Sequence, residues 1–531
     1  MKCLYVFTLS LLILLLTSAC GSSGTTEESL DTNYNGADIT TSYEVNHNTE
    51  DTITHEYNIS VSSPYELTLD YAIQRANNRR NNISNVDMDR LWELIQWQEP
   101  LSIDLLRFVS GYRVSSLSRE EAIYDANIMF EMLRHFYGGY NFLGGDEVFL
   151  PLFEDILEAI NEQEQWSGSM FLQLLRDYLS TVIADNHFHI ESHSLGVSYY
   201  VFIWDTPFER SEQGFRKQDT SLYLVDIVGY DKQDIFRLSV DEEGNFFYSA
   251  IFMKPESKGI IYDFDVVWSN GELETISLLR TPLSPTISGG EPSLHYVNDI
   301  PIVTFRTGMG NPFSYTRYID EYARRFISLA EYLYDESVII IDIRTNPGGF
   351  SMLTRLWLDI LLGEIVPNNF TILDSHWWED IPQMPEEWYE VFGLVSDEYL
   401  EKYNELFERH DPSEYIGNYH FFSTFPNQTI PNDILLILLV DRYTFSAGEF
   451  FTDQMLNIEN TLVIGQNTGG ALLTSSFPPL YLPNSGISYI MGPAHFAFHE
   501  NDWREGVGID PDIWVIGDAL TAALAILEGR K

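Results

Sequence analysis

Positive charge and cysteine are both scarce in this sequence. Only 30 basic side chains stand against 79 acidic ones, which gives 531 residues a formal net charge of −49. A chain this acidic repels the phosphates of nucleic acids and of anionic membrane surfaces, so a nucleic-acid-binding protein is excluded as a working hypothesis. Charged residues still make up an ordinary 21% and aromatic residues 14%, which indicates a globular protein with an acidic surface.

The two cysteines, Cys3 and Cys20, both lie near the N-terminus. Between them an apolar run from Leu4 to Leu16 is too short for a membrane-spanning helix, but it fits the hydrophobic part of an export signal. The run ends in Thr17-Ser18-Ala19-Cys20, which resembles the lipobox of bacterial lipoproteins, although Thr17 stands where leucine is usual. We therefore expect a signal peptide over residues 1–19 and lipidation of Cys20, which would make the protein a cell-membrane lipoprotein on the extracytoplasmic, bacterial surface side.

Alternatives to this interpretation are an ordinary signal peptide or an uncleaved anchor. If cleavage occurs before Cys20, the mature chain retains no second thiol. A disulfide framework, a CxxC zinc site and a cysteine nucleophile are then excluded.

The rest of the chain divides by composition and periodicity. Residues 20–55 are polar and predict a flexible tether, residues 56–195 a mainly helical domain, residues 196–290 a β-rich domain or insert, and residues 291–531 an α/β domain. The β-rich segment contains no titratable cluster of its own and is interpreted as a packing scaffold, with a divergent PDZ-like module left open.

In the helical part, Ser118-Arg119-Glu120-Glu121 is a capping box, and apolar residues follow at helical spacing until Gly138-Gly139. Further helices are expected near 88–97, near 152–160 and over 171–183. The last of these helices is followed by Asp185-Asn186-His187-Phe188-His189, so two histidines lie at the end of this domain.

In the α/β part, continuous aliphatic strands are expected at 301–305, 338–343 and 434–440, separated by helices at 318–334, at 352–362 and from Ser446 onward. Such strands are typical of a largely parallel sheet that is covered on both faces. Residues 368–432 form an aromatic-rich insert that is too long for a loop, and we expect a cap that gates a cleft.

Two of these strands lead into turns at helix starts, and both turns are suited to chemistry. The first strand runs into Arg344-Thr345-Asn346-Pro347-Gly348-Gly349, and the second into a turn that ends with Ser446-Ala447-Gly448-Glu449. The N–H of Ala447 could join that of Gly348 or Gly349 to hold an oxyanion, with Ser446 as a nucleophile at a helix N-terminus. Taken singly, the first turn could be only a turn and Ser446 only an N-cap.

Together the motifs resemble those of the C-terminal processing and tricorn-type serine peptidases, the tail-specific protease superfamily. The matching segments are Asp342 to Gly349, Ser446 to Glu449 and Val463 to Gly470, in the order that the family has them. The resemblance implies a crotonase-like catalytic domain with Ser446 as nucleophile and an oxyanion hole from Ala447 and Gly348 or Gly349.

The general base follows from the same resemblance. Ala471 stands where Ser-Lys members have their lysine, which excludes a Ser-Lys dyad. The tricorn-like branch uses a histidine from the helical domain and a C-terminal glutamate, which correspond here to His187 as base and Glu505 as the acid that orients it directly or through water.

Other assignments near the site stay open. His189 is a second candidate base, both histidines could simply cap a helix end, and His495 and His499 are more distant alternatives. Arg504 is expected to neutralise Glu505 rather than to bind a substrate carboxylate, and residues 482–486 are expected to border the cleft.

The leading hypothesis is thus an exported, lipid-anchored serine endopeptidase that hydrolyses polypeptides through an acyl-enzyme and needs no metal or organic cofactor. Its expected partners are a polypeptide substrate and, through Cys20, the membrane. A homo-oligomer is compatible with the resemblance, because relatives often form closed rings. The alternatives are a catalytically inactive peptide- or lipid-binding surface lipoprotein on the same fold and, on composition alone, carbohydrate recognition.

Overall fold

The computed structural model describes most of the chain downstream of residue 66. The described residues are 67–80, 113–255, 259–281, 290–306, 325–349, 351–364, 366, 371–375, 419–422, 429–476, 479–497 and 504–529. The expected signal peptide, the tether with Cys20, the helix near 88–97, His499 and most of the cap insert lie outside these residues.

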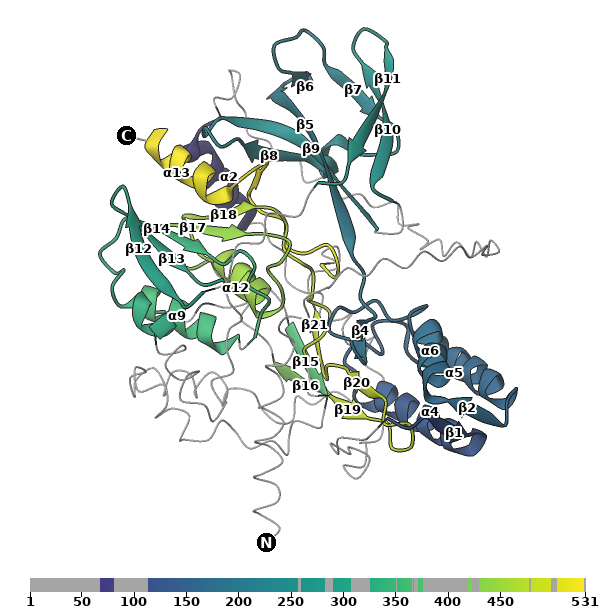
Figure 1. Cartoon of the computed structure of the whole chain (residues 1–531). Helices are drawn as coiled ribbons and strands as arrows, with labels where there is room; N and C mark the ends of the chain where they lie inside the picture. Colours follow the sequence, from purple (N-terminus) through teal and green to yellow (C-terminus); the bar gives the residue numbers. More distant parts are fainter. Residues whose placement is uncertain are drawn as a thin grey trace.

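One ten-stranded sheet carries both the α/β part and most of the β-rich part (Figure 1). Its six central strands are parallel neighbours, and antiparallel strands extend it at both ends. In spatial order the strands are β12 (Ser293–Val297), β13 (Ile300–Thr304), β14 (Val338–Asp342), β17 (Leu435–Val440), β18 (Thr461–Gly465), β22 (Ile513–Val515), β8 (Phe236–Val240), β9 (Phe246–Pro255), β5 (Tyr199–Ser211) and β6 (Gly214–Lys217).

The parallel strands are buried on both faces, as their continuous aliphatic sequences predict. In β17, Leu436 and Leu438 share a core with α9 (Met352–Leu362) and α12 (Ala447–Met455). The alternate residues Ile437 and Leu439 face a second core that includes α2 (Leu69–Arg80) and α13 (Ala519–Gly529). Side chains of a strand alternate between faces, so one strand supplies both cores.

The β-rich segment, for which the sequence predicts a domain or an insert, is joined to the parallel sheet. Strand β8 pairs in parallel with β22 through Trp514 and Val515, so the hydrogen-bonding edge of β22 is covered by the β-rich strands. A smaller sheet of β7 (Leu224–Ile227), β10 (Ile261–Trp268) and β11 (Leu273–Leu279) packs its aromatic residues into the same core, beside the short helix α7 (Lys232–Ile235).

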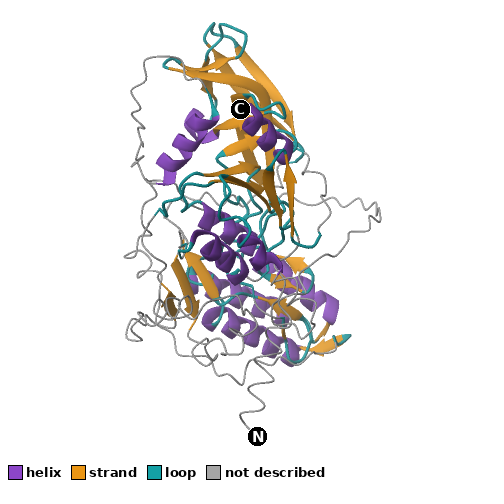
Figure 2. Ribbon diagram, turned by 90° about the vertical axis from the view of Figure 1, so that its left-hand side faces the viewer, coloured by secondary structure: helices purple, strands orange, loops and turns teal. Residues whose placement is uncertain are grey.

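A helical unit lies at the other end of the molecule (Figures 1 and 2). It consists of α4 (Arg119–His135), α5 (Gly145–Asn161) and α6 (Gly168–Leu179), with short strands β1 (Ser116–Ser118) and β2 (Gln165–Ser167) pairing across the helix starts. The predicted capping box is confirmed, because Ser118 accepts from the Glu121 N–H and Glu121 accepts from the Ser118 N–H. Helix α2, which the expected boundary at residue 56 assigned to this domain, packs on the main sheet instead.

Residues from the C-terminal part complete the core of the helical unit. Leu480, Leu482, Ile487 and Tyr489 are buried among α4, α5 and α6. Strands β19 (Leu480–Tyr481) and β20 (Ser488–Ile490) form a sheet with β3 (His189–Ile190) and β4 (His193–Ser194). Residues 482–486, expected at the cleft border, lie against α4.

Three further strands form a small sheet between the ten-stranded sheet and the helical unit (Figure 1). They are β15 (Thr371–Ser375), β16 (Tyr419–Phe422) and β21 (Ala494–Ala497), and the first two come from the segment expected to form the cap. In the parts of the chain that the structure describes, no helix combines the length and apolar character needed to cross a bilayer.

Trp514 connects the parallel and β-rich parts of the large sheet, which gives a first prediction. Its ring is fully buried against Val201 and Ile251 of the β-rich strands, and its indole N–H donates to Asp510 over 2.7 Å. We expect Trp514→Ala to lower the free energy of unfolding by about 3–5 kcal/mol, and Trp514→Phe by less. Denaturant titration followed by circular dichroism measures both. An unfolding free energy unchanged in Trp514→Ala would contradict the joined sheet.

Candidate active site

Ser446 sits in a strained turn between β17 and α12. Its φ of 50° and ψ of −116° lie outside the regions that non-glycine residues ordinarily occupy. Its hydroxyl makes no hydrogen bond to the first turn of α12. Instead, Ser446 Oγ lies 3.0 Å from His187 Nε2, so the serine is more than the N-cap that its position alone suggests.

His187 reaches the serine from a loop that follows α6. The backbone N–H of His187 donates to Asp185 Oδ1 over 2.9 Å, and the neighbouring Asn186 side chain donates to the Gly470 carbonyl over 2.6 Å. The Asn186 N–H donates to Glu505 over 2.6 Å. These contacts fix a loop of the helical unit onto turns of the α/β part.

The surroundings of the His187 imidazole favour its neutral form. Burial lowers the pKa of His187 below its usual value, against the charge of Asp185, which raises it. A hydrogen-bonding interaction with the Thr474 backbone also raises this pKa, and the charge of His189 lowers it. Among the described residues, no side chain makes a hydrogen bond of standard geometry with His187 Nδ1.

Glu505 does not touch His187 directly. One carboxylate oxygen accepts from the Asn186 N–H, and the other accepts from the N–H groups of Leu472 and Leu473 over 2.8 and 2.7 Å. The direct orienting contact, one of the two forms expected from the sequence, is therefore absent. Burial and then the charge of Asp185 raise the pKa of Glu505 well above its usual value, against those three hydrogen bonds.

The other histidines occupy different surroundings. His189 lies in β3, and burial lowers its pKa. His495 lies in β21, where its Nδ1 pairs with the Leu473 carbonyl at 3.0 Å and burial lowers its pKa to about 4. Arg504 donates to Asp453 of α12 over 2.7 Å, and neutralisation of Glu505 by Arg504 stays a prediction.

The oxyanion-hole candidates meet beside the serine. A Cβ added to Gly348, whose φ is +101°, would lie 2.7 Å from Ser446 Cβ, so only glycine permits this approach. The Gly348 N–H already donates to Asn346 Oδ1 over 3.0 Å. Gly349 is exposed, and no described residue accepts from the N–H of Ala447. Ala447 is thus a better candidate donor than Gly348, and Gly349 stays the second candidate that the sequence offers.

Glu449, the last residue of the serine motif, fastens the serine turn to the glycine-rich turn beyond β18. It is fully buried and accepts from the N–H groups of Ser446, Gly470 and Ala471 and from the Thr468 hydroxyl, at 2.6–2.9 Å. Burial raises the pKa of Glu449, and these hydrogen bonds oppose that rise. The glutamate is therefore a structural acceptor in this motif.

Arg442, for which the sequence predicted no role, cross-links the backbone segments that surround the serine turn. Its buried guanidinium donates to four backbone carbonyls, those of Tyr199, Thr468, Gly506 and Val507, at 2.9–3.3 Å. Arg442 therefore links the start of β5 to the glycine-rich turn that contains Thr468 and to the segment that follows Glu505.

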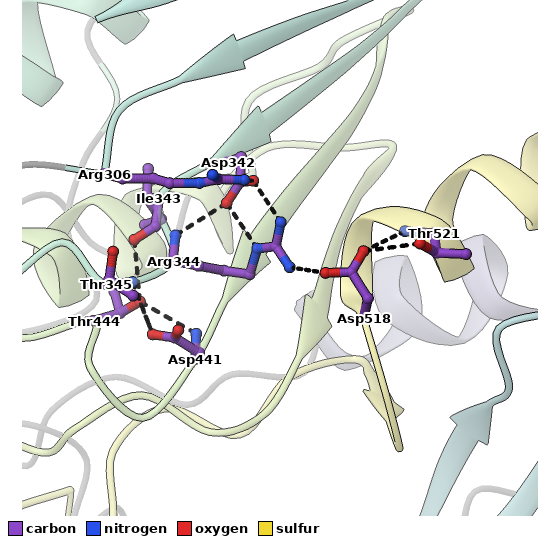
Figure 3. Close-up of polar contacts among 9 residues, drawn as sticks. All are labelled: Arg306, Asp342, Ile343, Arg344, Thr345, Asp441, Thr444, Asp518 and Thr521. Atoms are coloured by element: carbon purple, nitrogen blue, oxygen red, sulfur yellow. Dashed lines mark hydrogen bonds and ion pairs between the residues drawn. The ribbon is translucent and has the colours of Figure 1, made fainter. Parts of the chain in front are cut away.

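A network of charges supports the strand-to-helix turn that contains Gly348 (Figure 3). Arg344 donates to both oxygens of Asp342 and, over 2.7 Å, to Asp518, while Arg306 also pairs with Asp342. Burial opposes ionisation of Asp342, but the hydrogen bonds and charges of the two arginines hold its pKa below the usual value. This network explains the Asp-x-Arg spacing at the end of β14.

Asp441 joins this turn to the serine turn (Figure 3). Its Oδ1 accepts from the N–H of Thr345, at 2.9 Å, and from the N–H of Tyr443, at 3.0 Å. Thr345 has a φ of +64°, so its unusual conformation is stabilised from outside the turn. Across the residues that the structure describes, no cluster of His, Cys, Asp or Glu could hold a metal ion.

Comparison with known proteins assigns this part of the chain to a family. Residues 314–515 match the family model described as Peptidase family S41. The matched segment contains the Gly348 turn, Ser446 and Glu505, whereas His187 precedes it. This part of the chain is therefore similar to the serine-type peptidase domains of that family.

Several solved structures are similar to this chain at low sequence identity. Mature CPAF complexed with lactacystin is 14% identical, with 77% of this chain and 96% of that chain covered and a TM-score of 0.37. A lipoprotein from Streptococcus agalactiae is 12% identical, with 80% and 100% covered and a TM-score of 0.36. The tricorn protease is 13% identical, with 78% of this chain but 37% of that chain covered and a TM-score of 0.35. A comparison with curated proteins gives no match.

Asp441 gives the prediction for this site. We expect Asp441→Ala to lower the free energy of unfolding by about 1–3 kcal/mol, because the N–H groups of Thr345 and Tyr443 lose their acceptor. Asp441→Asn keeps an oxygen at the Oδ1 position and should cost less than about 1 kcal/mol. Denaturant titration of the three proteins measures the difference, and equal losses in both variants would contradict the bridging role.

Proposed function

We propose that the protein is an exported serine endopeptidase that hydrolyses polypeptides through an acyl-enzyme on Ser446. The observation that carries the proposal is the 3.0 Å approach of His187 Nε2 to Ser446 Oγ. These residues are 259 positions apart and come from different units, and the approach has the geometry of a base and its nucleophile. The family match adds that the substrate is a polypeptide.

The reaction follows from the groups at the site. Neutral His187 accepts the Ser446 proton as Oγ attacks the scissile carbonyl, and the N–H groups of Ala447 and Gly349 stabilise the oxyanion that forms. The imidazolium then donates its proton to the departing amine, which leaves an ester on Ser446. A water molecule, activated by the same imidazole, hydrolyses the ester and restores the serine.

The remaining parts of the proposal concern architecture and location. The parallel sheet with its two Gly- and Ser-bearing turns fits a crotonase-like catalytic domain. The chain is lipidated at Cys20, and residues 20–55 tether the enzyme to the extracytoplasmic face of a bacterial membrane. A homo-oligomer remains compatible with this arrangement.

A catalytically inactive binding protein is less well supported. A binding site alone does not require a serine held in a strained conformation against a part-buried imidazole whose pKa is lowered. The carbohydrate-binding alternative has no cluster of its own among the described residues.

A fluorophosphonate probe, which reacts with activated serines, tests the nucleophile and the base. We expect the mature chain to label covalently, Ser446→Ala to abolish labelling and His187→Ala to slow it by at least about 100-fold, because the serine loses its base. His189→Ala is the matched control and should retain labelling. If the folded wild-type protein does not label, the peptidase mechanism fails and the binding-protein alternative gains support.

The lipid anchor is tested by Cys20→Ala in bacterial cells. We expect wild-type protein to incorporate radiolabelled fatty acid and to sediment with membranes, and the variant to do neither, because the acceptor thiol is missing. Cys3→Ala is the control and should behave as wild type. Fatty-acid incorporation that persists in Cys20→Ala would contradict the assignment of Cys20.

A further inference from the structure

Asp185 is a buried carboxylate at the junction of three chain segments. Its side chain is 0% exposed. It accepts from the Tyr137 hydroxyl over 2.8 Å, from the Thr474 hydroxyl over 2.6 Å and from the His187 backbone N–H over 2.9 Å. Tyr137 follows α4 and Thr474 follows the glycine-rich turn, so the carboxylate joins the helical unit, the histidine loop and the α/β part.

All three donors are neutral. Among the described residues, no arginine or lysine forms an ion pair with Asp185. A carboxylate whose hydrogen-bond donors are all neutral has no opposite charge beside it to offset its own. The group that benefits is His187, whose pKa is raised by the charge of Asp185 against the effect of burial.

Glu505 has different partners and a different consequence. Its three donors are backbone N–H groups, those of Asn186, Leu472 and Leu473, and none belongs to His187. Burial and the charge of Asp185 raise the pKa of Glu505 well above its usual value. Asp185 and Glu505 both contact the histidine loop, and their different hydrogen-bond partners indicate different roles.

We propose that Asp185 is a positioning residue that supplies the negative charge which stabilises the His187 imidazolium, while Glu505 holds the histidine loop through the backbone. The inference rests on the proposed function, because it concerns the base of that reaction. It assigns to Asp185 the electrostatic task that the sequence suggested for Glu505.

Other ionisable groups near His187 could also move its titration. His189 lies on the same loop and lowers the pKa of His187, Glu505 approaches through Asn186, and Glu449 approaches from α12 through the backbone of Ser446 and Gly470. Tyr137 stands beside Asp185. A test must therefore compare variants that differ in one of these groups at a time.

Asp185→Asn removes the charge and can retain the contacts. The amide oxygen can still accept from the His187 N–H, and the amide NH₂ can donate to the hydroxyls of Tyr137 and Thr474, which accept as readily as they donate. Glu505→Gln cannot be accommodated in this way, because all its partners are N–H donors. The two substitutions therefore separate charge from structure.

The experiment measures the rate of fluorophosphonate labelling against pH in the mature wild-type chain and in Asp185→Asn, Glu505→Gln and Tyr137→Phe. The rate rises with pH as His187 loses its proton. We expect Asp185→Asn to move the midpoint of this rise to lower pH, because the imidazolium loses its stabilising charge, and to slow labelling at the plateau by at least about tenfold. Tyr137→Phe, which alters a contact of Asp185 but no charge, should leave the midpoint in place.

Glu505→Gln should lower the thermal unfolding midpoint and leave the pH midpoint in place. A pH midpoint that moves in Glu505→Gln but not in Asp185→Asn would overturn the inference, and so would a midpoint unmoved in both. If folded wild-type protein fails to label at any pH, the proposed function fails, and an NMR titration of the His187 ring tests the inference separately. Its resonance is identified by its loss in His187→Ala, and an unchanged titration in Asp185→Asn would overturn the inference.

Discussion

The approach of His187 to Ser446 depends on buried carboxylates that accept hydrogen bonds from backbone amides. Glu505 holds the histidine loop and the segment after Gly470, and Glu449 holds the serine turn against the same segment. Removing either carboxylate would leave several buried N–H groups without an acceptor, at a free-energy cost of about 1–3 kcal/mol for each. The geometry of His187 and Ser446 is therefore set by acceptors that touch neither His187 Nε2 nor Ser446 Oγ.

Some of the many acidic residues lie in the interior, where they link segments of the chain by accepting hydrogen bonds. Asp125 accepts from the N–H groups of Asn484 and Ser485, which fixes a C-terminal hairpin onto α4, and Asp342 is enclosed by two arginines. Desolvation makes a buried carboxylate costly unless several donors surround it. Each of these acids meets that condition, so they act as joints between segments distant in the sequence.

The sequence predicts local features well and long-range pairing poorly. The capping box at Ser118, the two-faced burial of β17 and the bounds of α9 follow from patterns within a few residues, and the structure confirms them. By contrast, nothing local in the sequence indicates that β8 pairs with β22 or that Arg504 pairs with Asp453. The sequence likewise does not show which N–H groups of the histidine loop donate to Asp185 and which to Glu505, because that depends on side-chain directions set by contacts between distant segments.

The hairpin buried among α4, α5 and α6 also determines when the helical unit can complete its core. Its residues, near position 485, follow the histidine loop by about three hundred positions, so the helical unit lacks part of its core until those later residues have been synthesised. Contacts of such high sequence separation form late and slowly in folding. A nascent chain that ends before this hairpin thus has an incomplete core beneath its histidine loop. The order of synthesis itself delays the approach of His187 to Ser446 until the hairpin has been made.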